Sequence, residues 1–353
     1  MTAPGAVLQL PPKGGSKGGR RSDPRSPEHR VLSSPPRRTA AAGGHLAKWL
    51  KRIGLALIAI VAGLVFGLAP YYLGGLGTVR RYQYPDKENA GLTPASFQLA
   101  FEDVAFAASD GVKLKGWWVG APEDRGTVIL VHGLNRSRIE MVRKLPFLHQ
   151  AGWNALLFDL RHHGESGGDA TSFGFWERQD VKAAVALARG RAKGPVVLWG
   201  VSLGAATVVM TAADDPTIAG VVCDSSYLSL RDTVSHHLGL ARHWIWWMRA
   251  VPSWPVADEV VYWMGRRGRF DPDAIDIQAA AKHLAGRPTL FVCNSGDRRM
   301  PREIAIGLQD AAGAAASLLV VPGDSHGGAY RDGTAAYETA VNKVLSAALG
   351  AQG

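Results

Sequence analysis

The chain has 353 residues, 46% of them hydrophobic, which is enough for the core of one large domain or two modest ones. Its net charge of +10 belongs to the N-terminus: residues 1–52 carry eleven Lys or Arg against Asp23 and Glu28, whereas residues 53–353 carry 29 basic and 28 acidic residues. A nearly neutral folded part argues against a nucleic-acid-binding protein, and two cysteines exclude a disulfide framework.

The first 52 residues form a basic tail rich in Gly, Pro, Ser and Arg. Such a segment has too few apolar side chains to offset the entropy lost on ordering, so we predict that it is disordered. A basic tail can bind nucleic acid or anionic lipid, but the segment that follows gives it a simpler role, as the cytoplasmic flank of a membrane helix.

Ile53–Leu76 is a run of 24 residues without a charge. At about 1.5 Å per residue, a helix of this length crosses a hydrocarbon core of about 30 Å. The charges before the run are basic and those after it are mixed, which places the N-terminus in the cytoplasm. We therefore predict a single-pass protein of the cell membrane whose remainder is extracytoplasmic, and periplasmic in a Gram-negative cell. Two other interpretations of this run stay open: a buried helix of the globular domain, and a cleaved signal peptide. No clear Ala-x-Ala cleavage site follows the run.

After a linker of about residues 77–96, short apolar runs alternate with helical patterns. The expected strands are Leu99–Phe106, Val112–Val119, Thr127–Val131, Asn154–Phe158, Val196–Trp199, Ile218–Cys223, Thr289–Cys293 and Ser317–Val321. The expected helices are Arg138–Gln150, Phe175–Arg189, Leu203–Ala213, Arg302–Ala312 and Thr334–Leu349. Asp110-Gly111 predicts an antiparallel hairpin between the first two strands. The alternation predicts an α/β fold with a mostly parallel eight-stranded sheet flanked by helices.

Residues 227–284 interrupt this alternation, because a simple crossover needs far fewer residues. Five of the eleven tryptophans of the chain fall inside this segment: Trp244, Trp246, Trp247, Trp254 and Trp263. We interpret it as an inserted cap. Its aromatic side chains can pack on the body, contact substrate, or lie against a bilayer, since tryptophan favours the membrane interface.

Gly200-Val201-Ser202-Leu203-Gly204 stands between an apolar strand and a helix of small residues. This is the pattern of a nucleophile elbow, a turn so tight that the residues two before and two after the serine must lack side chains. A serine hydroxyl is a poor nucleophile unless a base takes its proton. The motif therefore predicts a histidine and a carboxylate later in the chain.

Two further motifs precede the elbow. His132-Gly133 follows a strand, and Asp159-Leu160-Arg161-His162-His163-Gly164-Glu165-Ser166 is similar to an Asp-x-Arg-Gly-His-Gly-x-Ser loop. On these motifs, residues from about 98 to 350 resemble an α/β-hydrolase, close to the small bacterial serine esterases and lipases that are similar to monoacylglycerol lipase. The resemblance implies an α/β-hydrolase domain over residues 97–353 with a helical cap insertion. His162 stands where the family has glycine, which puts the local loop conformation in question.

The resemblance also implies the partners of Ser202. His326, in a glycine-rich loop after the last expected strand, stands where family members place their catalytic histidine. Asp297, just past a strand and followed by Pro301, approximately matches the region of the catalytic acid, which would hold the imidazole in one tautomer. Asp224, at the end of the preceding strand, is the alternative acid, because some family members use that site.

An oxyanion needs hydrogen-bond donors that are already aimed at it. The backbone N–H of Leu203, the residue after the nucleophile, supplies one donor, favoured by the helix N-terminus. By analogy with the family, the second donor comes from Leu134, with Asn135 as the alternative. His132 is interpreted as a residue that shapes this loop.

We predict no cofactor and no metal. The histidines lack His-Glu-x-x-His spacing, and no glycine cluster has the strand–helix context of a phosphate or dinucleotide loop. Cys223 and Cys293 are interpreted as small buried hydrophobic residues, and a bridge between them is conceivable only if their strands are neighbours.

These features together predict a membrane-anchored serine hydrolase that cleaves carboxylic esters through an acyl-enzyme. The tryptophan-rich insertion and the nearby bilayer favour a lipophilic substrate. The expected partners are a small-molecule or lipid ester and the membrane, with no nucleic acid; the sequence does not indicate an oligomeric state. A peptidase or amidase on the same fold, and a non-catalytic membrane-anchored binding protein, stay open as alternatives.

Overall fold

The structure is a computed structural model that describes residues 41–79, 81, 83 and 86–350. Residues 1–40 of the expected disordered tail therefore lie outside the described residues. The chain divides into two contact units, Met1–Leu55 and Ala56–Gly353. The sheet, its covering helices and every predicted site residue belong to the second unit.

Eight strands form one sheet in the order β1-β2-β4-β3-β5-β6-β7-β8. Their bounds are β1 Glu102–Ala107, β2 Lys113–Val119, β3 Thr127–Val131, β4 Asn154–Phe158, β5 Val196–Val201, β6 Gly220–Asp224, β7 Thr289–Asn294 and β8 Ala316–Val321. β1 pairs with β2, and β2 with β4, in antiparallel register, and every other pairing is parallel. The expected α/β fold, with its mostly parallel eight-stranded sheet and its hairpin at Asp110-Gly111, is confirmed.

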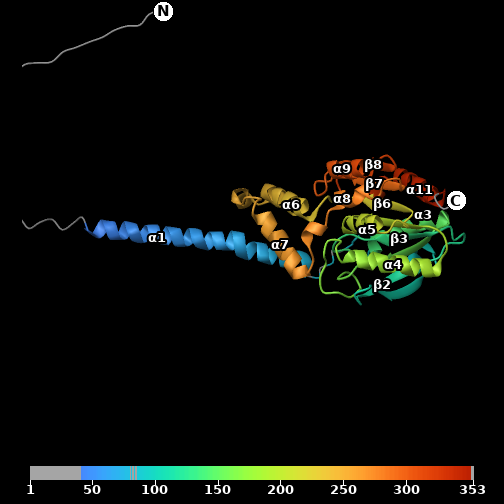
Figure 1. Ribbon diagram of the computed structural model, residues 1–353, viewed down its shortest axis with the longest axis horizontal. Helices are drawn as coiled ribbons and strands as arrows, with labels where there is room; N and C mark the ends of the chain where they lie inside the picture. Colours follow the sequence, from blue (N-terminus) through green and yellow to red (C-terminus); the bar gives the residue numbers. More distant parts are fainter. Residues whose placement is uncertain (1–40, 80, 82, 84–85, 351–353) are drawn as a thin grey trace, which may run out of the picture. The chain divides into compact units, whose positions relative to one another are not determined.

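Helices cover both faces of the sheet (Figure 1). On one face α4 (Glu177–Arg191), α5 (Leu203–Asp214) and α9 (Arg302–Ala312) supply buried side chains such as Val185 and Leu308. On the other face η3 (Arg138–Lys144), α3 (Leu145–Gln150), α10 (Ala329–Asp332) and α11 (Thr334–Gly350) do the same. Every residue of β3 to β7 is buried as a result, and the sequences of these strands are largely apolar.

The expected helix Arg138–Gln150 consists of two pieces, the 3₁₀ helix η3 and the α-helix α3. Pro146, in the first turn of α3, accounts for the break, because proline has no N–H to donate to the preceding turn. Proline at this position is favourable for starting the second helix.

The apolar N-terminal segment is helical. It comprises α1 (Ala41–Gly63), the π-helical η1 (Leu64–Leu68) and α2 (Ala69–Thr78). Within the described part of the chain, Gly44–Thr78 is the one helix long and apolar enough to cross a membrane, with a mean hydropathy of 2.5. The described helix already includes residues 41–52, ahead of the apolar run that starts at Ile53, and these residues include good helix formers such as Ala, Leu and Lys. Pro70 cannot donate to the turn before it, which accounts for the π-helical widening there.

The insertion between β6 and β7 is helical, as expected. It contains α6 (Leu230–Trp244), η4 (Trp246–Ala250), α7 (Val256–Gly268), η5 (Pro272–Ala274) and α8 (Ile277–Lys282). α8 packs on α5 and α9 of the body, so the cap proper is α6 to α7. Trp244, Trp246 and Trp254 are more than three-quarters exposed and Trp247 is 56% exposed, so these four do not pack the cap on the body. Trp263 alone of the five stacks edge-on against Tyr71 of α2.

Candidate active site

Ser202 stands in the turn between β5 and α5. Its backbone has φ 53° and ψ −113°, a conformation that L-residues rarely adopt. A methyl group at Gly200 would overlap the backbone of Gly204, and one at Gly204 would overlap the carbonyl oxygen of Val131. The two glycines of the motif are therefore sterically required, and the turn lifts Ser202 out of the carboxyl edge of the sheet.

The structure brings Ser202, His326 and Asp297 together from three different loops. Ser202 Oγ lies 2.9 Å from His326 Nε2, and His326 Nδ1 lies 2.7 Å from Asp297 Oδ2. The other carboxylate oxygen of Asp297 accepts the backbone N–H groups of Arg299 and Met300. Burial would raise the pKa of Asp297, but the hydrogen bond and charge of His326 together with these N–H groups lower it. An ionised carboxylate therefore fixes the imidazole with Nε2 free to accept the serine proton.

Asp224, the alternative acid, has other partners. Ser225 Oγ donates to its Oδ1 at 2.9 Å and the Tyr337 hydroxyl donates to its Oδ2 at 2.9 Å. The Asp224 carbonyl accepts the N–H of Ser202 at 2.8 Å, so its backbone supports the elbow. Full burial raises the pKa of its carboxyl group. The carboxylate in contact with His326 is thus Asp297.

Both residues predicted to supply the oxyanion donors lie near the serine, in the lining of one cavity with it. Leu203 is the first residue of α5, and Leu134 follows Gly133, where an added Cβ would stand 3.4 Å from the Cβ of Ser202. Within the described part of the chain, neither the N–H of Leu203 nor that of Leu134 donates to a backbone carbonyl of a turn or loop. Asn135, the alternative, has a left-handed φ of 59° and forms the bend of the loop. Two N–H groups beside a nucleophile can receive an oxyanion.

His132 is a loop-shaping residue, as the sequence indicated. It is fully buried, and its Nε2 accepts the N–H of Leu160 at 3.0 Å. Because Nε2 is an acceptor, Nδ1 carries the proton and donates to the carbonyl of Gly133 at 2.8 Å. Burial lowers the pKa of His132 to about 4. The ring is neutral and links the oxyanion loop to the loop after β4.

Glu140 is a site residue that the sequence did not single out. Its Oε2 accepts the N–H of Gly133 at 2.7 Å, and its Oε1 lies 3.5 Å from Arg136 Nε. Burial raises the pKa of Glu140. This carboxylate holds the peptide directly before Leu134. The one available signal is an acidic residue in the first turn of the helix that follows the His-Gly loop.

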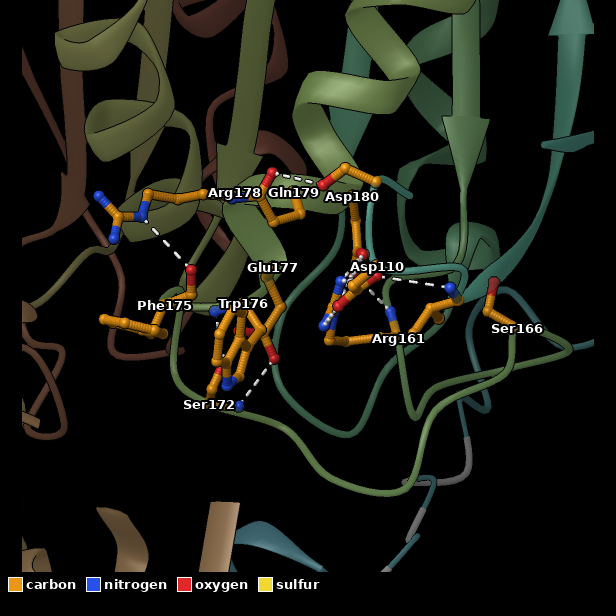
Figure 2. Close-up of polar contacts among 12 residues, drawn as sticks. Asp110, Arg161, Ser166, Ser172, Phe175, Trp176, Glu177, Arg178, Gln179 and Asp180 are labelled. Atoms are coloured by element: carbon orange, nitrogen blue, oxygen red, sulfur yellow. Dashed lines mark hydrogen bonds and ion pairs between the residues drawn. The ribbon is translucent and has the colours of Figure 1, made fainter. Parts of the chain in front are cut away.

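The loop that resembles Asp-x-Arg-Gly-His-Gly-x-Ser is braced by buried ion pairs. Asp159 accepts the backbone N–H of Arg138 at 2.7 Å and its guanidinium at 2.8 Å. Figure 2 shows Arg161 directed at Asp110 of the β1–β2 hairpin and at Asp180 of α4, with contacts of 2.6 and 2.7 Å. These contacts fix the loop between the sheet and α4.

His162, in the position where the family has glycine, has φ 63°. That is the left-handed region, which glycine enters at little cost and other residues rarely enter. The ring Nδ1 lies 3.2 Å from the carbonyl oxygen of Gly168, whereas Nε2 is buried without a partner among the described residues. The loop therefore keeps a glycine-like backbone with a histidine in it.

Glu177 fixes the next loop, which carries Phe173. Its carboxylate, beside Ser172 in Figure 2, accepts two hydrogen bonds from Ser172 and one each from Thr171 and Gly174. The carbonyl of Phe173 accepts the hydroxyl of Tyr227 at 2.7 Å. Phe173 is thereby held with a left-handed φ of 53°.

An apolar cavity of about 300 Å³ opens on one side of Ser202. It is lined by apolar side chains from α2, the loop after β3, the loop before α4 and the cap, among them Leu73, Leu134, Phe173, Leu230, Val260 and Met264. Its charged or titratable members are Tyr227, His237 and Arg299, and burial lowers the pKa of His237.

A second cavity, of about 280 Å³, lies on the His326 side of the site. Its lining is polar: Lys87, Arg136, Arg143, Lys144 and Arg331 against Asp86, Glu88 and Glu140. The site therefore has an apolar side at Ser202 and a polar side at His326.

Within the described residues, no group of three or more His, Cys, Asp or Glu side chains is placed to hold a metal ion. Cys223 and Cys293 are buried free thiols on the neighbouring strands β6 and β7. Burial raises the pKa of both, that of Cys293 to about 11. Their interpretation as small buried hydrophobic residues is confirmed.

Comparison with known proteins gives matches over the same region. Residues 122–293 match the family described as serine aminopeptidase, S33 (Hydrolase_4). The chain is 23% identical over 239 residues to YqkD of Bacillus subtilis, covering 67% of this chain and 76% of that one. It is 33% identical over 170 residues to YfhR of Salmonella typhimurium, covering 43% of this chain and 56% of that one, so this match spans little more than half of the relative.

Among solved structures, an esterase of Pyrococcus furiosus, Pf2001, aligns with a TM-score of 0.60. It is 22% identical, and the alignment covers 76% of this chain and 98% of the esterase. At that identity the likeness is one of fold.

Proposed function

We propose that this chain, which has the α/β-hydrolase fold and matches a hydrolase family over residues 122–293, is a membrane-anchored serine hydrolase that cleaves carboxylic esters. Ser202 is the nucleophile, His326 the general base and acid, and Asp297 the group that orients His326. Leu203 and Leu134 supply the oxyanion donors. The helix Gly44–Thr78 anchors the protein in the cell membrane, with the catalytic domain on the extracytoplasmic side.

The observation that carries this proposal is the continuous chain of hydrogen bonds from Ser202 through His326 to Asp297, beside an apolar cavity. His326 Nε2 takes the proton as Ser202 Oγ attacks the ester carbonyl, and Asp297 stabilises the imidazolium. The oxyanion forms beside two preorganised N–H groups, each worth roughly 3–4 kcal/mol of transition-state stabilisation.

Collapse of the tetrahedral intermediate breaks the bond to the alcohol, which takes the proton from His326. Water then attacks the acyl group on Ser202, with His326 again acting as base, and releases the acid. The leaving alcohol departs on the side of His326, where the polar cavity lies, and the acyl group occupies the apolar cavity. An ester with an apolar acyl part and a polar alcohol part fits both sides.

A peptidase or amidase is the second candidate, and the match to a family described as serine aminopeptidase favours it. The same three residues can cleave either bond. In the polar cavity, Asp86 and Glu88 offer partners for a free amino terminus, beside the five basic side chains of the same lining. The 300 Å³ apolar cavity favours an ester with a hydrocarbon chain.

A substrate panel separates these candidates. Purified full-length protein in detergent is assayed with p-nitrophenyl esters, thioesters and aminoacyl anilides, with Ser202→Ala as the matched control. We expect ester hydrolysis that falls by about 10⁶ in the control. Faster anilide than ester cleavage would support the peptidase, and undiminished ester hydrolysis by Ser202→Ala would contradict the serine mechanism.

A further inference from the structure

The membrane helix contributes directly to the cavity beside Ser202. Leu73, in α2, lines this cavity together with Ser202, Phe173 and the cap residue Met264. Leu73 is also part of the charge-free run Ile53–Leu76, three residues before its end. At about 1.5 Å per residue, it lies roughly 4.5 Å along the helix axis from the end of the apolar run.

α2 packs closely on α7 of the cap. An added Cβ at Gly74 would lie 2.8 Å from the Cβ of Trp263, and one at Gly75 would lie 2.8 Å from the guanidinium of Arg267. Tyr71 stacks edge-on against Trp263 with ring centroids 5.0 Å apart. Small residues at such a contact allow two helices to approach closely, so the cap is seated on the membrane helix itself.

The outer end of α2 is also bonded to the catalytic loops. The carbonyl of Thr78 accepts the N–H of Thr171, in the loop that carries Phe173, at 2.9 Å. Just beyond the helix, Arg81 donates to the carbonyl oxygens of His163 and Ser166 at 3.1 and 2.8 Å. The position of Leu73 at the cavity is therefore fixed from both the cap and the body.

The cap carries a further apolar surface. Trp244, Trp246, Trp247 and Trp254, which we call the cap tryptophans, lie on or beside η4 and are 56–81% exposed. Tryptophan is enriched where hydrocarbon meets the lipid headgroups. α7 of the same cap packs on the outer part of the membrane helix. The apolar environment nearest to the cap tryptophans is therefore the bilayer surface.

We propose that the apolar cavity is filled by the acyl chain of a lipid that enters directly from the bilayer alongside α2, and that Leu73 of the membrane helix limits the length of that chain. This assignment rests on the proposed esterase function and names its substrate class, a membrane-resident acyl ester. The membrane helix is then a wall of the acyl site as well as an anchor.

The first test measures chain-length selectivity at Ser202. Full-length protein in detergent is labelled with a fluorophosphonate bearing a short alkyl chain and with one bearing a dodecyl chain. Leu73→Trp fills the cavity and should lower the rate of labelling by the long probe at least tenfold, with less than a twofold change for the short one. Leu76→Trp is the matched control, because Leu76 is on the same helix, 52% exposed and outside the cavity lining; it should change neither rate.

Leu73→Ala provides the opposite change and should raise the long-to-short labelling ratio at least threefold. If Leu73→Trp is labelled by neither probe, the role of Leu73 is judged from the labelling ratio of Leu73→Ala alone. An unchanged ratio in Leu73→Ala, or the same change in Leu73→Trp and Leu76→Trp, would overturn the role of Leu73. Absence of labelling of the wild type by both probes would instead contradict the proposed serine hydrolase.

The second test addresses the route of entry. The protein is reconstituted into phosphatidylcholine vesicles, and a long-chain glycerol monoester is placed either in the same vesicles or in an equal amount of separate ones. Entry from the bilayer predicts at least tenfold faster hydrolysis in the same vesicles, with equal rates for a water-soluble acetate ester. Equal rates for the long-chain ester in both arrangements would contradict entry from the bilayer.

Discussion

His326 Nδ1 lies 2.7 Å from Asp297 Oδ2, whereas Asp224, at the end of the neighbouring strand β6, accepts hydrogen bonds from Ser225 and Tyr337 instead. Both carboxylates stand at the carboxyl edge of the sheet, close to the same imidazole. The two carboxylates differ in their hydrogen-bond partners rather than in their positions relative to the strands. The two aspartates should therefore respond differently to the same substitution.

Asp297→Asn should lower kcat for ester hydrolysis by about 10³–10⁴, because the imidazole loses the acceptor that fixes its tautomer. Asp224→Asn should lower it less than about tenfold, since it leaves the contact of His326 with Asp297 in place. Steady-state kinetics of the two variants decide. A larger loss in Asp224→Asn would transfer the role of the acid to Asp224.

Glu140 is expected to act as a positioning residue for the oxyanion loop. Glu140→Leu leaves the N–H of Gly133 without its acceptor, which costs about 1–3 kcal/mol and lets the N–H of Leu134 move. We expect kcat to fall about 10–100-fold with KM changed less than threefold. Glu140→Gln keeps a carbonyl oxygen in place and should recover most of kcat. A loss expressed wholly in thermal stability, with normal kcat, would show that Glu140 is only structural.

Acid should destabilise the fold at His132. Burial lowers the pKa of this residue to about 4, from 6.5 in an unfolded chain, so between those values the unfolded state binds more protons. Stability therefore falls as the pH is lowered from 6.5 towards 4, by roughly 3 kcal/mol for a shift of this size.

Thermal unfolding of the detergent-solubilised chain at pH 7 and pH 4.5 measures this effect. His132→Gln, which keeps a donor and an acceptor but does not titrate, should show a smaller drop in Tm between the two values. The buried carboxyl groups are the same in both proteins, so the difference isolates His132. An identical drop in Tm would contradict a buried neutral imidazole.

His162 and Gly164 should differ in their tolerance to exchange, although both have positive φ. His162→Gly removes a strained residue and an unpaired ring nitrogen, but it adds entropy to the unfolded chain, so stability should change by less than about 1 kcal/mol. Gly164→Ala places a methyl group into the carboxylate of Asp159 and should destabilise by more than about 2 kcal/mol. Thermal unfolding of His162→Gly and Gly164→Ala measures the two changes in stability. Equal changes in the two variants would contradict this prediction.

The cap tryptophans should matter for membrane-bound substrate only. Replacing all four by Ser removes exposed apolar surface without touching the cavity lining. Hydrolysis of a long-chain ester in vesicles should fall at least fivefold, and that of a soluble acetate ester should stay within twofold. Equal effects on both substrates would indicate a structural role for these side chains.

Much of the fold follows from short-range patterns in the sequence. β3 and β4 have the expected bounds because they are apolar runs closed by polar turns, and α9 because proline precedes it and glycine follows it. Ser202 was recognisable because two glycines are required by the sterics of one turn. These features depend on residues that are neighbours in the chain.

Contacts that depend on how the elements fold back and pack could not be predicted in this way. Glu140 and Gly133 meet only because η3 turns back over the oxyanion loop, and Leu73 reaches the cavity only because α2 packs on a cap nearly 200 residues later. The assignment of the acid needed the same information, since Asp224 and Asp297 both follow strands. The sequence placed the tryptophans in the cap, but their exposure depends on how α6 and α7 pack.

The acyl-enzyme is the intermediate on which the account depends, and it can be observed directly. Full-length protein is mixed with a p-nitrophenyl ester, quenched in acid within one turnover, digested and analysed by mass spectrometry. The account predicts an acyl group on the peptide containing Ser202, and no adduct in Ser202→Ala. Ester hydrolysis with the acyl group on another residue, or a Ser202→Ala variant that still forms the adduct, would contradict it.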